Sequence, residues 1–478
     1  MQPFLFSDTL QISYLYFLLF IFVIMEQTTD NFSPNLYLGV RGLAIKILNR
    51  IDRTDAYLDK LLEIEIKNSD LSGQDKALLF EIVHGVIRWL GRIDWILNGF
   101  YKGQFSKAVP NIKNALRVAV YQMLFLDKVP DYAAVNESVD FVKKLQGQKH
   151  ADQTNAVLRN ILRTKDAIKY PDPNEDIINY LATYYSHPYW MVKRWLARFG
   201  NEQTEQLLIS NNGKPSLSLR VNNLVSNKEE LKSLLDKVNL KYTESIYVKD
   251  FIKLNILTNI ADWTYFANGY FSVQDESTGI PVYLLDPKPG MRVLDFCAAP
   301  GGKTGLLADL MNNEGEIVAL DKYESRTKIL EKNLLRLKVT NVKIVVADAL
   351  EYNDGLFDRV LIDAPCSGLG TLTKKPDVKW KKDLGDIRNL NAIQSELLEK
   401  GASLLKQGGY LVYSTCTMEP EENYSIIQKF LFGNPHFELD IDKTFFPNEL
   451  YDENGCLSAF PHLHNIDGSF SARIKRIS

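Results

Sequence analysis

The chain has 478 residues, of which 45% are hydrophobic and 24% charged, and its formal net charge at pH 7 is −3. This length allows about three domains, and the composition is ordinary for a globular protein. The slightly negative total excludes a polycation that coats nucleic acid with its whole surface, so any nucleic-acid contact must come from local basic patches.

The chain opens with an apolar stretch, Tyr14–Met25, which is too short for a comfortable bilayer span. No Lys or Arg precedes Arg41, and no small-residue cleavage site follows the stretch, so it does not resemble a signal peptide. We interpret residues 1–24 as a start-site extension or apolar leader, with Met25 as the true start. A membrane anchor is the alternative interpretation.

Residues 25–184 make up the first expected domain. From Tyr37 to about Tyr184 the apolar residues show helical spacing, with breaks at Ser72-Gly73, Pro110, Pro130 and Gly147. The pattern predicts an all-α domain. Its basic residues form either an RNA-binding face or the solvated side of the helices. These residues are Arg88, Arg92, Lys113, Arg117, Lys143, Lys144, Lys149, Arg159 and Arg163.

The sequence pattern of residues 185–289 predicts a linker helix followed by a small α+β module. The helix, Ser186–Gly200, interleaves tryptophans with basic residues, which suits either stacking on RNA or packing between domains. Strand-like runs at Ser216–Asn222, Tyr247–Leu257 and Tyr270–Val273, with a helix over Lys228–Val238, make up the module. We interpret this region as RNA-binding.

Strands and helices alternate strictly in residues 290–478, which predicts a doubly wound, mostly parallel sheet. The expected strands are Arg292–Phe296, Glu316–Asp321, Val342–Asp348, Phe357–Ala364 and Gly409–Cys416, and the expected helices are Lys303–Met311, Tyr323–Leu337, Leu384–Leu405 and Glu419–Phe432. Ligands of such sheets bind at the carboxyl ends of the strands.

A turn rich in small residues, CAAPGGK at residues 297–303, follows the first of these strands. It lacks the first glycine of a P-loop and has no G-x-G-x-x-G fingerprint. Its glycines permit close approach of a ligand to the backbone. Asp321 ends the next strand about 20 residues later, the spacing at which a carboxylate meets ribose hydroxyls. The pattern predicts a nucleoside-containing ligand without a phosphate chain, and the competing interpretation is an ordinary helix-capping turn.

Two of the four cysteines follow expected strands. Cys366 lies in DAPCSG, just after Asp363, and Cys416 lies in STC. A cysteine at a ligand-bearing strand end is a candidate for a reactive group, although a lone cysteine is more often a small core residue. Cys297 lies in the CAAPGGK turn, and we expect Cys456 to be inert. The absence of C-x-x-C pairs predicts no metal site and no disulfide framework, as in a reducing cytoplasm.

These motifs, with Gln274-Asp275 and the run KPDVKW at residues 375–380, resemble the NOL1/NOP2/Sun family of RNA cytosine-5 methyltransferases. The first domain resembles the NusB-like domain of the bacterial small-subunit ribosomal RNA branch, the RsmB or Fmu type. The resemblance covers nearly all of the chain from about Leu36 onward. It implies an α/β Rossmann-like methyltransferase domain, S-adenosyl-L-methionine as cofactor, and transfer of a methyl group to C5 of a ribosomal RNA cytosine.

The resemblance also implies site residues. The implied cofactor-binding residues are Cys297, Ala298, Ala299, Pro300, Gly301, Gly302, Lys303, Asp321 at the ribose, Arg326, Asp348 near the adenine, and Asp363. The implied catalytic residues are Cys416, Cys366, Asp363 and Lys303. Cys416 is the attacking thiolate in this family and Cys366 assists product release. The alternative within the same chemistry makes Cys366 the nucleophile.

The substrate cytosine must be unstacked, because C5 and C6 cannot be attacked inside a helix. We therefore expect a loop or hairpin of ribosomal RNA as partner and no DNA. A basic cluster that flanks Trp380 is the candidate RNA contact, with a solvated loop as the alternative. It comprises Lys374, Lys375, Lys379, Lys381 and Lys382. We expect a cytoplasmic monomer. The rival function is a non-catalytic RNA-binding ribosome assembly factor.

Overall fold

The computed structural model describes residues 37–254 and 263–478, and the expected leader and Met25 lie outside them. The described chain forms two compact units. One comprises residues 37–213 together with Lys375–Lys381, and the other comprises the remaining described residues from Lys214 onward. Within the described residues, no helix has the length and apolar character needed to cross a membrane.

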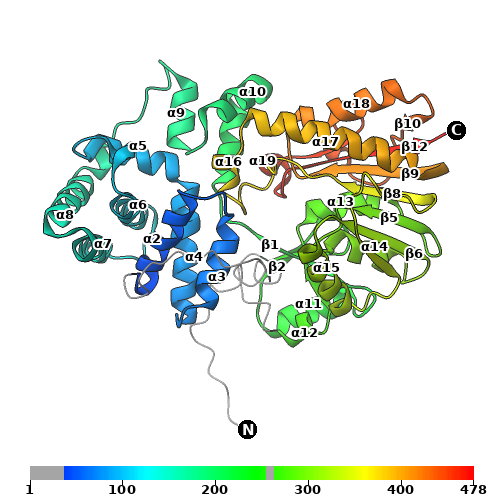
Figure 1. Ribbon diagram of the computed structural model, residues 1–478, viewed down its shortest axis with the longest axis horizontal. Helices are drawn as coiled ribbons and strands as arrows, with labels where there is room; N and C mark the ends of the chain where they lie inside the picture. The colour runs from blue at the N-terminus through cyan, green and yellow to red at the C-terminus, as the bar shows by residue number, and fades with distance from the viewer. Residues whose placement is uncertain (1–36, 255–262) are drawn as a thin grey trace, which may run out of the picture. The chain divides into compact units, whose positions relative to one another are not determined.

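The first unit is all-helical, as predicted, and Figure 1 shows its helices packed against one another without a sheet. Its helices are α2 (Gly39–Ile51), α3 (Leu58–Lys67), α4 (Gly73–Arg88), α5 (Leu90–Phe100), α6 (Pro110–Phe125), α7 (Asp131–Gln146), α8 (Gln148–Arg163), α9 (Ile177–Tyr184), α10 (Tyr189–Asn211) and α16 (Val378–Lys381). The core helix α6 is buried along nearly its whole length, and Pro110 at its first turn lacks only an amide hydrogen that the helix does not use.

Two features of this unit differ from the expected boundaries. Helix α10 extends to Asn211, well past the expected end at Gly200, because the chain kinks at Gly200 (φ 74°) and then resumes helical geometry. The unit accordingly reaches Gly213, whereas the predicted all-α domain ends at Tyr184. The unit also contains Lys375–Lys381, a segment that belongs by sequence to the third domain.

The second unit begins with a small antiparallel sheet, as expected for an α+β module. Its elements are β1 (Leu217–Val221), α11 (Lys228–Lys237), β2 (Tyr242–Glu244), β3 (Phe251–Leu254), α12 (Thr264–Ala267) and β4 (Phe271–Val273), and the strand order is β2-β3-β1-β4. The strand expected over Tyr247–Leu257 is confirmed only for its centre, and its last residues lie outside the described part.

A twisted eight-stranded sheet forms the rest of this unit. Five strands are parallel in the order β9-β8-β5-β6-β7, and an antiparallel group of β12, β10 and β11 extends the sheet beyond β9. The strands are β5 (Arg292–Phe296), β6 (Glu316–Asp321), β7 (Val342–Val346), β8 (Phe357–Asp363), β9 (Leu405–Thr415), β10 (Phe437–Leu439), β11 (Leu457–Ala459) and β12 (Ser469–Arg476). The predicted fold class is confirmed.

Helices cover both faces of this sheet (Figure 1). The helices are α13 (Glu276–Leu285), α14 (Gly302–Leu310), α15 (Glu324–Arg336), α17 (Leu384–Ser403), α18 (Tyr424–Gly433) and α19 (Pro461–His464). Successive strand residues point to opposite faces, so Leu294 packs with the α17 and α18 side whereas Val293 packs with α13 and α14. Both faces are therefore apolar, and the polar strand ends are left for a ligand.

Candidate active site at the strand ends

Strand register brings the expected site residues to one edge of the sheet. Phe296 on β5 is level with Leu320 on one side and Ile362 on the other, and Asp363 on β8 is level with Ser414 on β9. The residues that directly follow these strands therefore converge, because parallel strands all end at the same edge.

The glycine turn connects β5 to α14. Cys297 has a positive φ of 59° and Gly301 a φ of 101°, and Gly301 is the N-cap of α14. The positive φ of Gly301 is one that L side chains rarely adopt, and a Cβ there would also lie 2.6 Å from Leu330 Cδ1, so this position favours glycine. The amides of the first turn of α14 have no acceptor within the helix, which leaves donors for a ligand. Burial raises the pKa of Cys297 to about 12, so this thiol stays neutral.

The next strand contributes Asp321, whose side chain is almost completely buried. One carboxylate oxygen accepts the Tyr323 amide hydrogen at 3.1 Å. The other accepts no hydrogen bond from the described residues and lies 3.4 Å from Arg326 Nη1. Arg326 also donates to the carbonyl of Ala299 at 2.8 Å, which ties α15 to the glycine turn. A buried carboxylate oxygen that lacks a hydrogen donor fits the hydroxyl groups of a ribose.

Asp348 lies beyond the end of β7. It accepts a hydrogen bond from Lys322 at 2.9 Å and another from the Leu350 amide at 3.1 Å, and these bonds hold its pKa below the usual value. The charged carboxylate is thus fixed at the third strand end along the edge, next in line after Asp321. These positions together fit a nucleoside-bearing cofactor laid along the ends of β5, β6 and β7.

An ion pair lies at the centre of the edge. The Lys303 ammonium group is 2.6 Å from Asp363 Oδ2. Burial alone lowers the pKa of Lys303, but the attraction of Asp363 outweighs it and the pKa ends above its ordinary value. Asp295 on β5 is fully buried and accepts a hydrogen bond from Thr304 Oγ1 at 2.7 Å. Burial raises the pKa of Asp295 to about 7.

The two strand-end cysteines are in contact. Their sulfur atoms are 3.0 Å apart, and the Cys416 amide donates to Cys366 Sγ at 3.2 Å. The hydrogen bond to Cys416, together with burial, raises the pKa of Cys366 well above its ordinary value. Cys366 is therefore the thiol that retains its proton. Cys456 is buried in the apolar core, and burial raises its pKa, as expected for an inert residue.

The structure does not support the expected RNA-contact cluster around Trp380. Lys379 is 1% exposed and donates to the Arg88 carbonyl, and the Trp380 indole donates to the Ile87 carbonyl, so both are structural parts of the helical unit. Lys374 is held between Asp275 and Asp467. Of Lys374, Lys375, Lys379 and Trp380, Lys375 alone is exposed. The remaining three have their polar groups engaged internally, which corrects the prediction that they hold phosphate.

The basic residues of the helical unit divide in the same way. Arg117 is buried and pairs with Asp52 and Asp94, and Lys113 also pairs with Asp52. Five others are exposed on α7 and α8, namely Lys143, Lys144, Lys149, Arg159 and Arg163. An RNA-binding face of this unit would therefore be formed by α7 and α8 and not by the core helices.

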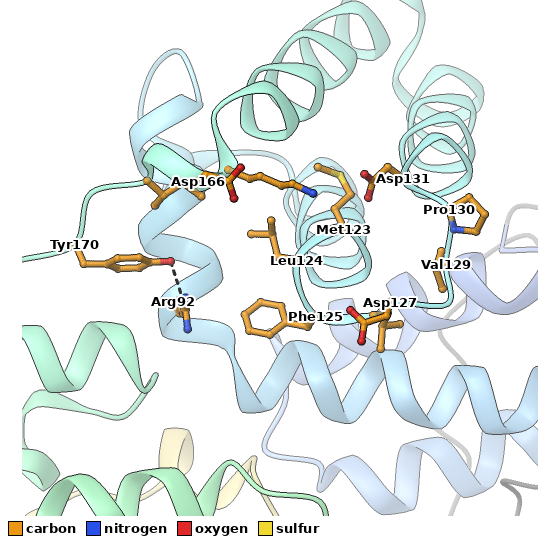
Figure 2. Close-up of a pocket in the computed structure, with 13 residues that line it drawn as sticks. Arg92, Met123, Leu124, Phe125, Asp127, Val129, Pro130, Asp131, Asp166 and Tyr170 are labelled. Atoms are coloured by element: carbon orange, nitrogen blue, oxygen red, sulfur yellow. Dashed lines mark hydrogen bonds between the residues drawn. The ribbon is translucent and has the colours of Figure 1, made fainter.

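A cavity of about 630 Å³ also lies in the helical unit (Figure 2). Arg92 lines it and donates to the Tyr170 hydroxyl at 2.9 Å, with its guanidinium 4.2 Å from the Tyr184 ring centroid. Its charged lining residues are three carboxylates, Asp127, Asp131 and Asp166, and two cations, Arg92 and Lys165. The excess of negative charge disfavours phosphate, so the strand-end cluster remains the candidate active site.

Sequence reasoning missed several residues of the site. Asn333 donates to the Pro300 carbonyl at 2.9 Å and so fixes the glycine turn from α15. Asp295 and Thr304 form the buried pair beneath it. Glu422 accepts the amide hydrogen of Ser367, next to Cys366. The signal available for Glu422 was a run of acidic residues, PEE, after the STC motif, in a segment that we expected to be ordinary helix.

Three family models match the chain. The model described as 16S rRNA methyltransferase RsmB/F matches residues 282–475, the NusB family model matches residues 39–163, and the ferredoxin-like domain of RsmF/B-like methyltransferases matches residues 187–261. These matches confirm the expected NusB-like domain, α+β module and methyltransferase domain.

Curated relatives match over almost the whole length. The probable ribosomal RNA small subunit methyltransferase B of Bacillus subtilis is 36% identical over 92% of this chain and 99% of its own. The ribosomal RNA small subunit methyltransferase B of Vibrio vulnificus is 33% identical over 84% of this chain and 93% of its own. Among solved structures, PH0851 is 29% identical with a TM-score of 0.77 and covers 92% of this chain and 99% of its own.

A methyltransferase homolog from Pyrococcus horikoshii is 32% identical with a TM-score of 0.57, over 63% of this chain and 99% of its own. The matches thus extend over all three parts of the fold and include the strand ends where the cysteines, the ion pair and the glycine turn converge. The chain belongs to the RsmB/F family of ribosomal RNA small-subunit methyltransferases.

Proposed function

We propose that the protein transfers a methyl group from S-adenosyl-L-methionine to C5 of a cytosine in small-subunit ribosomal RNA, through a covalent bond between Cys416 and C6 of the base. The observation that carries the proposal is the pair of cysteine sulfurs, 3.0 Å apart, at the ends of two adjacent parallel strands. Methyl transfer to a good nucleophile requires no thiol. Methylation of cytosine C5 does require one, because C5 is a poor nucleophile until a thiolate adds to C6.

The cofactor fits the residues of the glycine turn and the two following strand ends. Asp321 has a buried oxygen without a hydrogen donor among the described residues, and Arg326 and Asn333 hold the backbone of the turn in place. When bound, the cofactor supplies an electrophilic methyl group on a sulfonium centre. Asp321 would accept from the ribose hydroxyls, while the first-turn amides of α14, which lack an acceptor within the helix, would donate to the ligand.

Three residues have distinct roles in the reaction itself. Lys303 places a positive charge beside Asp363 and within the electrostatic reach of Cys416, which favours the thiolate form of Cys416. Asp363 is placed to accept a hydrogen bond from the cytosine edge and so to stabilise charge during addition. Cys366 keeps its proton and contacts the Cys416 sulfur, so it can assist departure of that sulfur.

The alternative with Cys366 as nucleophile is less well supported. A nucleophilic cysteine needs a lowered pKa, whereas burial and the Cys416 contact raise that of Cys366. The second rival, a non-catalytic assembly factor, does not require a thiol pair and the Lys303–Asp363 ion pair at the same edge of the sheet. A reducing cytoplasm suits the proposed reaction, because both thiols must stay reduced.

The test uses purified protein, labelled S-adenosyl-L-methionine and ribosomal RNA from cells that lack the gene. Methyl transfer and covalent protein–RNA adducts on a denaturing gel are compared for the wild type, Cys416→Ala and Cys366→Ala, with Cys456→Ala as the matched control for loss of a buried thiol. We expect transfer by the wild type and Cys456→Ala, none by Cys416→Ala, and a persistent adduct with Cys366→Ala.

Digestion of the labelled RNA to nucleosides then identifies the product as 5-methylcytidine. An adduct that survives in Cys416→Ala and disappears in Cys366→Ala would reverse the two cysteine roles. Failure of the wild type on naked RNA and on small-subunit particles alike would favour the assembly-factor function.

A further inference from the structure

Glu422 is a fully buried carboxylate between the two loops that carry the cysteines. It lies in a 3₁₀ turn, Pro420–Glu422, a few residues after Cys416. One of its oxygens accepts the Ser367 amide hydrogen at 2.8 Å, and the other accepts the Ser367 hydroxyl hydrogen at 2.5 Å. Ser367 directly follows Cys366. The carboxylate therefore fixes the backbone next to one cysteine from the loop that carries the other.

Neighbouring side chains donate hydrogen bonds to the Glu422 carboxylate or to the loop that it holds. Gln394 Nε2 donates to the carboxylate at 3.0 Å and to the Pro365 carbonyl at 2.8 Å. The Thr417 hydroxyl lies 2.8 Å from Ser367 Oγ and also hydrogen-bonds to the Glu422 carboxylate. The carboxylate has donors on both oxygens, which favour its charged form, but burial is the larger effect and its pKa stays above the ordinary value.

The two cysteines consequently have neighbours of opposite charge. Lys303 is a cation whose field reaches Cys416. The pKa of Cys366 is raised mainly by its hydrogen bond with Cys416 and by burial, and the charge of the Glu422 carboxylate raises it further. Besides Cys416 and Glu422, Tyr413 is a titratable neighbour of Cys366; its own pKa is raised by burial and its hydroxyl donates to the Glu422 carbonyl. A negative charge disfavours a thiolate, so this arrangement favours the thiol at Cys366.

We propose that Glu422 is a positioning residue for the cysteine pair, which holds the Cys366 loop against the Cys416 loop and assigns the neutral thiol to Cys366. This inference rests on the proposed function for its role in turnover. In the release step the C5 proton passes to water and its electron pair re-forms the C5–C6 double bond. The C6–S bond breaks and its electron pair goes to Cys416 Sγ, where the Cys366 thiol donates a hydrogen bond.

The first test does not depend on methyl transfer. Alkylation of each cysteine by iodoacetamide is followed by peptide mass spectrometry across pH 7–10 in the wild type and Glu422→Gln. We expect Cys366 in Glu422→Gln to be alkylated about tenfold faster at a given pH, as for a thiol pKa lower by one unit. Glu422→Asp keeps the charge and should return the rate toward that of the wild type.

Asp250→Asn is the matched control. Asp250 is also a buried carboxylate, which accepts a hydrogen bond from the Tyr283 hydroxyl at 2.6 Å, but it belongs to the small α+β module. Its loss should leave Cys366 alkylation unchanged. If Glu422→Gln does not fold, Ser367→Ala removes one donor to the carboxylate while keeping the charge, and is expected to loosen the loop and expose Cys366 to the reagent.

The second readout is release of the RNA adduct. Glu422→Gln should retain single-turnover methylation but accumulate adduct, as Cys366→Ala does, with rescue by Glu422→Asp. Cys366 alkylation within twofold of the wild type in Glu422→Gln would overturn the inference, even if methylation is normal. Conversely, Cys366 alkylation could be tenfold faster in Glu422→Gln while the wild type methylates no RNA. This outcome would support Glu422 as a positioning residue and reject only the proposed reaction.

Discussion

Replacement of Lys303 by methionine tests whether the ion pair with Asp363 drives the reaction. The substitution keeps the length of the side chain but removes the charge that lies 2.6 Å from Asp363 Oδ2. Two unit charges at this distance attract by about 6 kcal/mol at an effective dielectric of 20 and by about 1.6 kcal/mol in bulk water. The Asp363 side chain is 35% exposed and that of Lys303 14%, so solvent screens part of the interaction.

We therefore take about 2–3 kcal/mol as the loss, which corresponds to roughly 30- to 150-fold in rate if it is felt in the transition state. The assay is single-turnover methyl transfer under saturating cofactor, which separates chemistry from product release. Lys303→Arg should recover part of the rate, because it restores the charge in a longer side chain.

Lys406→Met is the matched control. Lys406 pairs with Asp358 at 2.8 Å at the opposite end of β8. This variant removes an ion pair of the same kind from the same strand, and its single-turnover rate should lie within twofold of the wild type. A Lys303→Met rate within about fivefold of the wild type would refute the reasoning, since the charge would then contribute little beyond local structure.

Three further predictions concern single side chains. Asp321→Asn should weaken cofactor binding by about 10- to 100-fold in titration calorimetry, because a charged acceptor of the ribose is lost; unchanged affinity would place the ribose elsewhere. Lys379→Met should leave RNA affinity and its salt dependence unchanged in a filter-binding assay, since the ammonium is buried; a reduced salt slope would restore Lys379 as a phosphate contact. Asp295, whose pKa is raised from 3.8 to about 7, contributes stability that is fully present below pH 3.8 and is lost as pH rises through 7. Relative to Asp295→Asn, the melting temperature of the wild type should therefore fall between pH 5 and pH 8, and parallel curves would contradict the assigned pKa.

Most of the catalytic sheet could be predicted from the sequence. Strands β5 and β6 were predicted with their observed bounds, because buried parallel strands are short apolar runs that end in turn residues. The antiparallel strands at the carboxyl terminus were not predicted. Strand β12 contains Arg473 and Lys475 among its apolar residues, and the alternation of strand and helix on which the prediction relied had ended before it.

The site could be predicted where its residues follow strands and could not where they act from elsewhere. Cys366, Cys416 and Asp363 were found because they end strands. Glu422 was not, since its function depends on a fold that brings it to Ser367. The lysines near Trp380 illustrate the opposite error. A run of basic residues predicts a surface patch, but Lys379 is buried because its ammonium meets carbonyl and amide oxygens of other helices.

The position of α16 has a consequence for synthesis of the protein. The helical unit ends at Gly213 but also includes Lys375–Lys381, so its last piece is translated 168 residues later. At elongation rates of about 5–20 residues per second, this piece is translated roughly 8–34 s after Gly213. During this interval the surroundings of Ile87, Arg88 and Leu58 lack the segment that later bonds to them. The nascent amino-terminal half is thus a candidate client for chaperones. The helical unit can be completed only after the loop that lies within the methyltransferase domain sequence has been synthesised.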